Sequence, residues 1–408
     1  MRTPHGFQML RSTLAGAGDA EVARVVTMVD AMARRGVADA LIEPLRPRLA
    51  QMRPIRPFSF ARLLFVPVDP LIVPAPAWRR GTLSVPRTAL GPIAAALREL
   101  LPDEASQIDA QAGPGDTPDA RIGELAAMLW PRAAAALGGM PVPPGWGATG
   151  LADSDYPPMA AAIAALLGVA LGIQAIALMG EAAPEGAIRT ILGRTAPRGG
   201  PALSAVVAVL LARLPGSGRI VSLATEAAGG SPPRSVDAAV DHVLDSLQAA
   251  VDGGSAIGAG LAQATADTAH IVGMLSEVEF SAATRPDRKR RIERARHGAG
   301  QLCLERFAAA ARQEFTARLD ALAAIPDDPA MLALEAGARG LRRLEAAGRR
   351  LGGGEAYDAT LRACLSRLQE SSGVLGLGDR VRLVEILMGT EQALLALSQV
   401  NGGTGLPP

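Results

Sequence analysis

The sequence lacks most of the residues from which metal sites and nucleophilic sites are built. Its 408 residues include two cysteines, four histidines and only 3% aromatic side chains. Cys303 and Cys364 stand alone in apolar helical patterns, so they form neither a disulfide framework nor a zinc site, and we expect both in the core. Lys289 is the only lysine against forty arginines. Lysine-based phosphate binding or Schiff-base chemistry therefore has one available position.

Local catalytic motifs are also absent. The sequence has no G-x-x-x-x-G-K-[ST], G-x-S-x-G or H-E-x-x-H pattern and no paired C-x-x-C. The segment GSGRIV begins like a dinucleotide loop but has Val221 where the third glycine belongs. We therefore expect no cofactor. The first 21 residues contain no apolar run of signal-peptide length and no twin-arginine pair, which favours a cytoplasmic location.

Alanine-rich apolar segments make up most of the chain and predict an all-α, multi-helix bundle. Hydrophobic residues reach 49% with few aromatics, a composition that suits helices packed closely through small side chains. No repeat of fixed period is visible, and a solenoid-like arrangement stays open as an alternative. Gly and Pro clusters separate the expected helices, which span residues 19–41, 122–137, 157–182, 201–213, 235–251, 257–281, 286–323, 328–351, 355–371 and 379–400.

A proline-rich strip near residues 54–86 interrupts this helical pattern. Its prolines forbid a continuous helix, so we expect an extended segment with two short strands, lying in a groove between helices. The Gly- and Pro-rich loop at 138–150 predicts a domain boundary. We therefore expect an N-terminal helical region over 1–146, a C-terminal bundle over 147–401 and a disordered tail over 402–408.

Charge is distributed unevenly along the chain. Residues 44–98 hold nine arginines and one acid, Asp69, whereas residues 226–279 hold eight acids and one arginine, so these two segments are predicted to face each other. Asp69 in an apolar strip would be costly without a partner, and a structural ion pair with Arg62 is the preferred interpretation. In the helix over 328–351, the pairs Glu335–Arg339 and Glu345–Arg349 are expected outside the apolar stripe.

A basic run at the start of the 286–323 helix is a candidate interaction face. Its side chains are Arg288, Lys289, Arg291 and Arg294. The run lacks interleaved aromatics, and the whole chain has a formal net charge of only +1, which argues against a nucleic-acid partner and for a protein partner.

Two further features leave alternatives open. Asp267-x-x-His270 has metal-like helical spacing, but a hydrogen-bonded helical histidine is the simpler interpretation. An enzyme with a pocket built from distant residues would draw on Asp69, Asp267 and His270. Residues 159–180 contain no charge over 22 positions, which fits either a core helix of a soluble bundle or a single span of the inner membrane.

Three phrases carry a resemblance. FARLLFVPVDPLIV, LRRLEAAGRRLG and RVRLVEILMG are similar to segments of bacterial all-helical proteins of unknown function. The resemblance implies a helical fold and no activity, cofactor or catalytic residue. Taken together, the sequence predicts a non-enzymatic, intracellular interaction or scaffold protein. Its alternatives are a membrane-associated protein and an enzyme without a recognisable motif.

Overall fold

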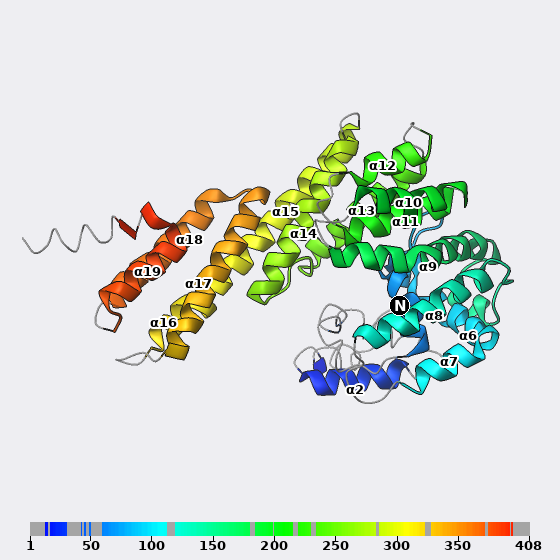
Figure 1. Ribbon diagram of the computed structural model, residues 1–408, viewed down its shortest axis with the longest axis horizontal. Coiled ribbons are helices and arrows are strands. Elements are labelled where there is room, and N and C mark those ends of the chain that lie inside the picture. Colours follow the sequence, from blue (N-terminus) through cyan, green and yellow to red (C-terminus); the bar gives the residue numbers. More distant parts are fainter. Residues whose placement is uncertain are drawn as a thin grey trace, which may run out of the picture. The chain divides into compact units, whose positions relative to one another are not determined.

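The structure is a computed structural model. It describes residues 13–14, 17–30, 42, 45, 49, 59–111, 119–179, 184–198, 200–214, 219–229, 234–282, 285–322, 328–371, 374–391 and 393–394. The predicted all-α, multi-helix class is confirmed, since helices carry almost all the regular structure of these residues (Figure 1). The predicted tail at 402–408 lies outside the described residues, as does most of the second arm of the helix pair expected over 19–41.

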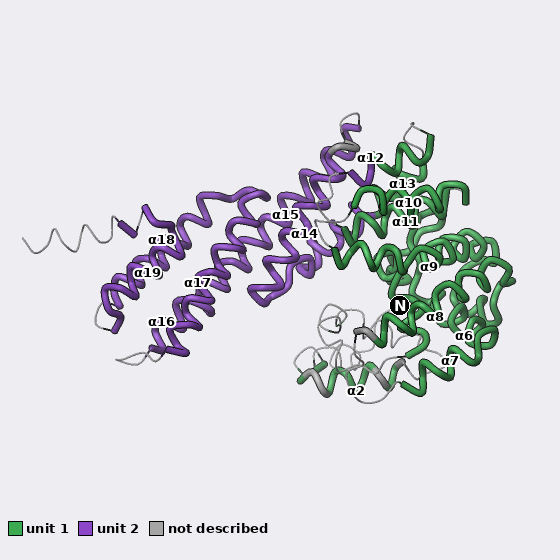
Figure 2. The backbone as a smooth tube through the Cα atoms, in the orientation of Figure 1, with its two compact units in different colours: residues 1–214, 222–242 green, residues 215–221, 243–408 purple. Residues whose placement is uncertain are grey.

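The chain divides into two compact units, which Figure 2 shows in two colours. Unit 1 comprises residues 1–214 and 222–242, and unit 2 comprises residues 215–221 and 243–408. Both α12 (Ile220–Ala227) and α13 (Arg234–Asp252) contribute residues to each unit.

The other helices and strands up to residue 214 lie wholly in unit 1. In chain order they are α2 (Asp19–Asp30), α5 (Phe60–Phe65), η3 (Val66–Leu71), β1 (Ile72–Val73), η4 (Ala75–Ala77), β2 (Val85–Pro86), α6 (Arg87–Leu100), α7 (Pro102–Asp109), α8 (Asp119–Leu137), η5 (Trp146–Thr149), η6 (Asp153–Asp155), α9 (Tyr156–Met179), α10 (Glu185–Thr195), η8 (Ala196–Arg198) and α11 (Gly200–Arg213).

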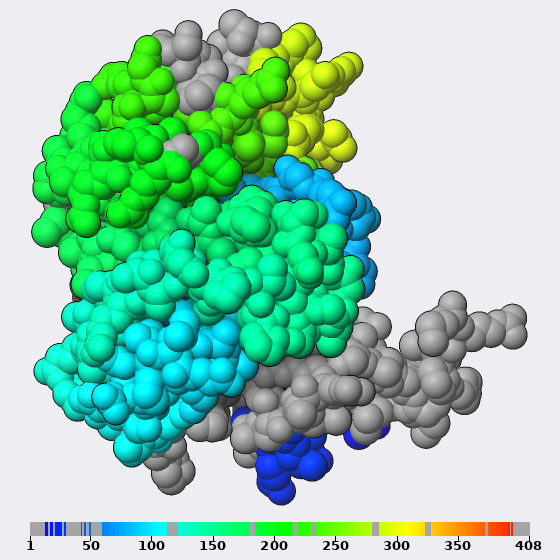
Figure 3. Space-filling view, turned by 90° about the vertical axis from the view of Figure 1, so that its right-hand side faces the viewer, coloured from blue at the N-terminus to red at the C-terminus, as the bar shows by residue number. Residues whose placement is uncertain are grey.

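The proline-rich strip is more helical than predicted. Ser59 caps α5 by accepting the backbone N–H of Arg62 at 3.3 Å, and η3 continues the turn with Pro67 near its start. Proline is tolerated there because the first N–H groups of a helix have no internal partner. The two expected strands do form, as a short parallel pair, β1 with β2. Figure 3 shows part of the strip, in light blue, at the surface beside the teal segment that includes α9.

Helix α9 forms the centre of unit 1. It packs against α8, α11, α10 and η3, and twelve of its side chains are buried, while Ala161, Leu171 and Ala175 are exposed on one side of the helix. Its length and hydropathy meet the criteria for a membrane span, and half of its most apolar 18-residue window is buried inside the protein. Large apolar side chains are also exposed at its C-terminal end, at Leu178 and Met179.

The predicted division at residues 146/147 falls inside unit 1. Helices α8 and α9 pack directly against each other although the loop at 138–150 separates them in sequence. Trp146 from that loop is buried, and its ring meets Tyr156 edge-on at 5.2 Å between centroids. The Nε1–H of Trp146 donates to the carbonyl of Ala152 at 3.1 Å. A Gly- and Pro-rich composition therefore marks a packed corner here rather than a linker.

Unit 2 is an array of long helices. They are α14 (Leu261–Ala282), α15 (Pro286–Ala310), α16 (Ala317–Asp320), α17 (Asp328–Gly348), α18 (Gly354–Glu370) and α19 (Leu377–Met388), with η10 (Arg349–Leu351) extending α17. The long helix predicted from residue 286 is present, but a π-helical segment, η9 (Ala311–Thr316), separates α15 from α16. Helix α17 lies against α14, α15 and η9, and its glycines allow these close approaches.

Candidate functional site

The four residues of the predicted basic face have different environments. Arg288 is buried, with 3% of its surface exposed, because it lies on the same stripe of α15 as Ile292 and Ala295. The side chain of Arg291 is less than a third exposed and forms an ion pair with Asp245 at 2.6 Å. Lys289 and Arg294 are exposed. The structure therefore does not present these cations as one interaction face.

The sequence predicts a buried Asp69, but in the structure this residue is exposed. The 3-10 turn of η3 directs its neighbours Val68 and Leu71 into the core and leaves the Asp69 side chain exposed. The cost of burial on which the predicted pairing with Arg62 was based therefore does not arise. The Asp69–Arg62 ion pair itself stays a prediction.

The predicted docking of the basic strip on the acidic segment stays a prediction. Within unit 1, α13 contacts the strip through a hydrogen bond between Nε2 of His242 and the carbonyl oxygen of Pro70 at 3.0 Å. Asp245 of the same helix pairs with Arg291 instead.

The contacts of Asp267 and the burial of His270 indicate structural roles for both residues. The carboxylate of Asp267 accepts the backbone N–H of Gly258 at 2.8 Å and Nε2 of Gln263 at 2.7 Å, and so it fixes the loop before α14. Burial lowers the pKa of His270, and the Asp267 charge opposes that effect. In the part of the chain that the structure describes, no three His, Cys, Asp or Glu side chains are placed to hold a metal ion.

The remaining candidates for catalysis belong to different units. Asp69 belongs to unit 1, whereas Asp267 and His270 belong to unit 2. Both thiols are buried, and burial raises the pKa of Cys364 to about 11, which keeps this thiol protonated near neutral pH. Cys303 is enclosed by Thr268, whose Oγ1 lies 3.4 Å from its Sγ, by Gly348 of α17 and by Tyr357 of α18. These thiols are core residues, as the sequence predicted.

A different surface emerges on α17, where arginines lie over buried carboxylates. The helix carries two glutamates after its first turn, Glu335 and Glu345, and these are only 7% and 3% exposed. The predicted pairs with Arg339 and Arg349 are confirmed, but the carboxylates lie inside rather than on the solvent side. The arginines of this segment are Arg339, Arg342, Arg343, Arg349 and Arg350.

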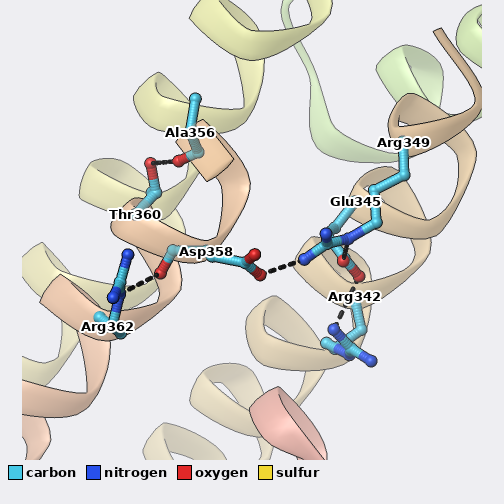
Figure 4. Close-up of polar contacts among 7 residues, drawn as sticks. All are labelled: Arg342, Glu345, Arg349, Ala356, Asp358, Thr360 and Arg362. Carbon is cyan, nitrogen blue, oxygen red and sulfur yellow. Dashed lines mark hydrogen bonds and ion pairs between the residues drawn. The ribbon is translucent and has the colours of Figure 1, made fainter. Parts of the chain in front are cut away.

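Glu345 is held by two arginines of its own helix. Its Oε2 accepts Nη1 of Arg342 at 2.7 Å, and its Oε1 accepts Nε of Arg349. The Nη2 group of Arg349 reaches across to the carboxylate of Asp358 on α18, as Figure 4 shows. A buried carboxylate is stable only when its lone pairs are satisfied, and these charge-assisted hydrogen bonds satisfy them.

Glu335, ten residues before Glu345 on α17, is held in a similar way, and one of its two arginines comes from α19. It accepts Nη2 of Arg339 at 2.6 Å and Nε of Arg382 at 2.5 Å. The Arg382 side chain is 60% exposed, and that of Arg339 is 46% exposed. The charged atoms that reach solvent here are therefore those of the guanidinium groups.

Arg343 and Arg350 complete this surface. They are exposed, seven residues apart on one side of the helix, and no ion pair to either occurs among the described residues. We call the set Arg339, Arg342, Arg343, Arg349, Arg350 and Arg382 the arginine face.

No family model, curated protein or solved structure matches this chain. The chemistry of the arginine face therefore has to be read from its own residues, and the resemblance to bacterial helical proteins stays a prediction.

The sequence did contain a signal for this face. The phrase LRRLEAAGRRL places two Arg-Arg pairs seven residues apart, which puts them on one side of a helix after two turns. What local spacing does not reveal is the burial of Glu335, because Arg382 comes from a helix 47 residues further along the chain.

Proposed function

We propose that this protein is a non-enzymatic, cytoplasmic interaction protein that binds an acidic segment of a protein partner through its arginine face. The proposal rests on one observation: between residues 329 and 351 the exposed charges are arginines, while both glutamates of that segment are buried. A surface of single sign attracts partners of the opposite sign and repels cationic ones. Guanidinium groups match carboxylates particularly well, because their planar donors can bind both oxygens.

Several partly exposed contacts, rather than one strong contact, would supply the affinity. An exposed ion pair contributes about 0.2–1 kcal/mol and weakens with salt. Because the arginine face holds six guanidinium groups on α17, η10 and α19, a partner with several carboxylates can add these small terms together. Binding should therefore decrease steeply as ionic strength rises.

Reversing the two arginines without an ion pair tests the proposal. Arg343→Glu together with Arg350→Glu is expected to weaken binding of a fluorescein-labelled, glutamate-rich helical peptide by about tenfold or more, measured by fluorescence anisotropy. The matched control is Arg24→Glu with Arg194→Glu, which makes the same charge change at exposed positions of unit 1 and should alter the affinity less than about twofold. Equal losses in the two double variants would leave only an effect of net charge and would contradict the proposal.

Membrane association is a second candidate function, favoured by the exposed apolar end of α9. Leu178 is 84% exposed and Met179 is 54% exposed, on the longest apolar helix that the structure describes. If α9 is a core helix, protein expressed without detergent should remain in the supernatant after ultracentrifugation, with a helical circular dichroism spectrum. Protein that pellets with membranes and resists a carbonate wash would instead show that α9 spans the membrane. Membrane association would then replace binding of an acidic partner as the first candidate function.

A further inference from the structure

One exposed carboxylate already lies against the arginine face, and it belongs to the protein itself. Helix α18 starts after a turn in which Gly352 and Gly353 adopt φ values of 111° and 77°, a conformation that favours glycine. This turn brings the first part of α18 back along the end of α17. Asp358 consequently meets Arg349, and its carbonyl oxygen accepts Nε of Arg362 at 3.3 Å (Figure 4).

Asp358 differs from Glu345 in its exposure to water. The Asp358 side chain is 49% exposed, whereas that of Glu345 is 4% exposed, although both bind Arg349. Removing a buried partner leaves an uncompensated charge in a poorly solvated place, while an exposed ion pair costs little to break because water replaces it. Of the two carboxylates on Arg349, Asp358 is the one that can be exchanged.

Arg349 contacts the Asp358 carboxylate directly, while Arg342 binds the neighbouring Glu345 and Arg362 binds the backbone carbonyl oxygen of Asp358 (Figure 4). The pKa of Asp358 is lowered chiefly by its hydrogen bond from Arg349, and the charges of Arg362 and Arg342 lower it further. These cations therefore stabilise an anion at that point in space. Three guanidinium groups and two carboxylates, those of Asp358 and Glu345, lie in this region, so one excess positive charge remains while Asp358 is in place.

We propose that Arg349, with Arg342 close to it on Glu345, forms a carboxylate-binding site that Asp358 fills in the free protein and that a carboxylate of the acidic partner takes over in the complex. This inference rests on the proposed function, since it assigns the internal competitor of the same arginine face. Asp358 then acts as an autoinhibitory contact: it weakens binding of weakly acidic segments and reserves the face for partners with several carboxylates.

Two isosteric changes on α18 test the inference. Asp358→Asn removes the competing charge and should raise the affinity for the glutamate-rich peptide by about 3- to 10-fold in an anisotropy titration. Glu355→Gln makes the same change of net charge three residues earlier, at an exposed glutamate, and should raise it by less than about twofold. Equal effects of the two variants would overturn the inference, because a general charge effect would then account for both.

Failure of this inference can be told apart from failure of the proposed function. If Arg343→Glu with Arg350→Glu abolishes binding while Asp358→Asn matches Glu355→Gln, the arginine face binds acidic segments without the exchange at Asp358. If neither the wild type nor Asp358→Asn binds the peptide in low salt, both are wrong. Asp358→Ser, which removes the same charge with a smaller side chain, repeats the comparison if the asparagine variant has an altered circular dichroism spectrum.

Discussion

Replacing Gly337 with alanine is expected to lower the free energy of unfolding of unit 2 by about 3 kcal/mol. A Cβ atom at this position would lie 2.4 Å from the carbonyl oxygen of Glu314 and 3.3 Å from its carbonyl carbon. The obstacle is backbone, in the π-helical segment η9, so it cannot rotate away as a side chain would. Relief requires α17 and η9 to separate, which would open the packing around both helices.

Gly340 provides the matched control because it lies three residues further along the same helix. Its added Cβ would also approach a neighbour to 2.4 Å, but that neighbour is Cδ2 at the tip of the Leu261 side chain. Leucine can change rotamer, and alanine favours a helix over glycine by about 1 kcal/mol, so Gly340→Ala should cost less than about 1 kcal/mol. Urea denaturation followed by far-UV circular dichroism measures both variants. Equal midpoints for Gly337→Ala and Gly340→Ala would contradict the close backbone approach.

Replacing Gly348 with alanine is expected to destabilise unit 2 by about 2–3 kcal/mol, through a different conflict. The added Cβ would lie 2.1 Å from the hydroxyl oxygen of Tyr357 and 2.8 Å from Sγ of Cys303. Tyr357 is fully buried and its ring packs edge-on against Phe307 at 5.0 Å between centroids, so it has no free space into which to move. The methyl group would therefore force the tyrosine out of its place.

A second substitution shows whether the tyrosine hydroxyl is the cause. Tyr357→Phe removes a buried hydroxyl whose polar neighbour is Sγ of Cys303, a weak hydrogen-bonding atom, so alone it should change stability by less than about 1 kcal/mol. Combined with Gly348→Ala it should recover about 1 kcal/mol, a coupling typical of residues in contact. The recovery is partial because Sγ of Cys303 and Cζ of the ring remain close. Strictly additive effects in the same urea experiment would place the conflict elsewhere.

Helices were predictable from the sequence because the signals for them are local. Alanine-rich apolar runs bounded by Gly and Pro gave α9 and α17 to within about three residues, and the stripe of the 235–251 segment corresponds to α13. The strip was less predictable, since prolines exclude a continuous α-helix but neither the six-residue helix α5 between them nor the short 3-10 turns of η3 and η4. The loop at 138–150 misled for a related reason: its composition resembles a linker, while Trp146 anchors it in the core.

The candidate site was harder to predict because burial of charge depends on distant residues. Arg288 lies on the apolar stripe of α15, where the sequence suggests a cation directed to solvent. Glu335 looks like one half of an exposed i, i+4 pair until Arg382 of α19 is placed over it. The position of Arg288 follows from spacing along α15, since Ile292 is four residues further along the helix, whereas the burial of Glu335 depends on the packing of α19 against α17.

The two buried glutamates of α17 also affect the entropy of any association at the arginine face. A free arginine side chain carries about 2 kcal/mol of rotamer entropy, and part of it is lost whenever a partner fixes the side chain. Arg339, Arg342 and Arg349 are already restrained by Glu335 and Glu345 when the chain folds. These three side chains are therefore largely ordered during folding. An acidic segment that binds them loses less side-chain entropy, because the orientations of the guanidinium groups are already fixed.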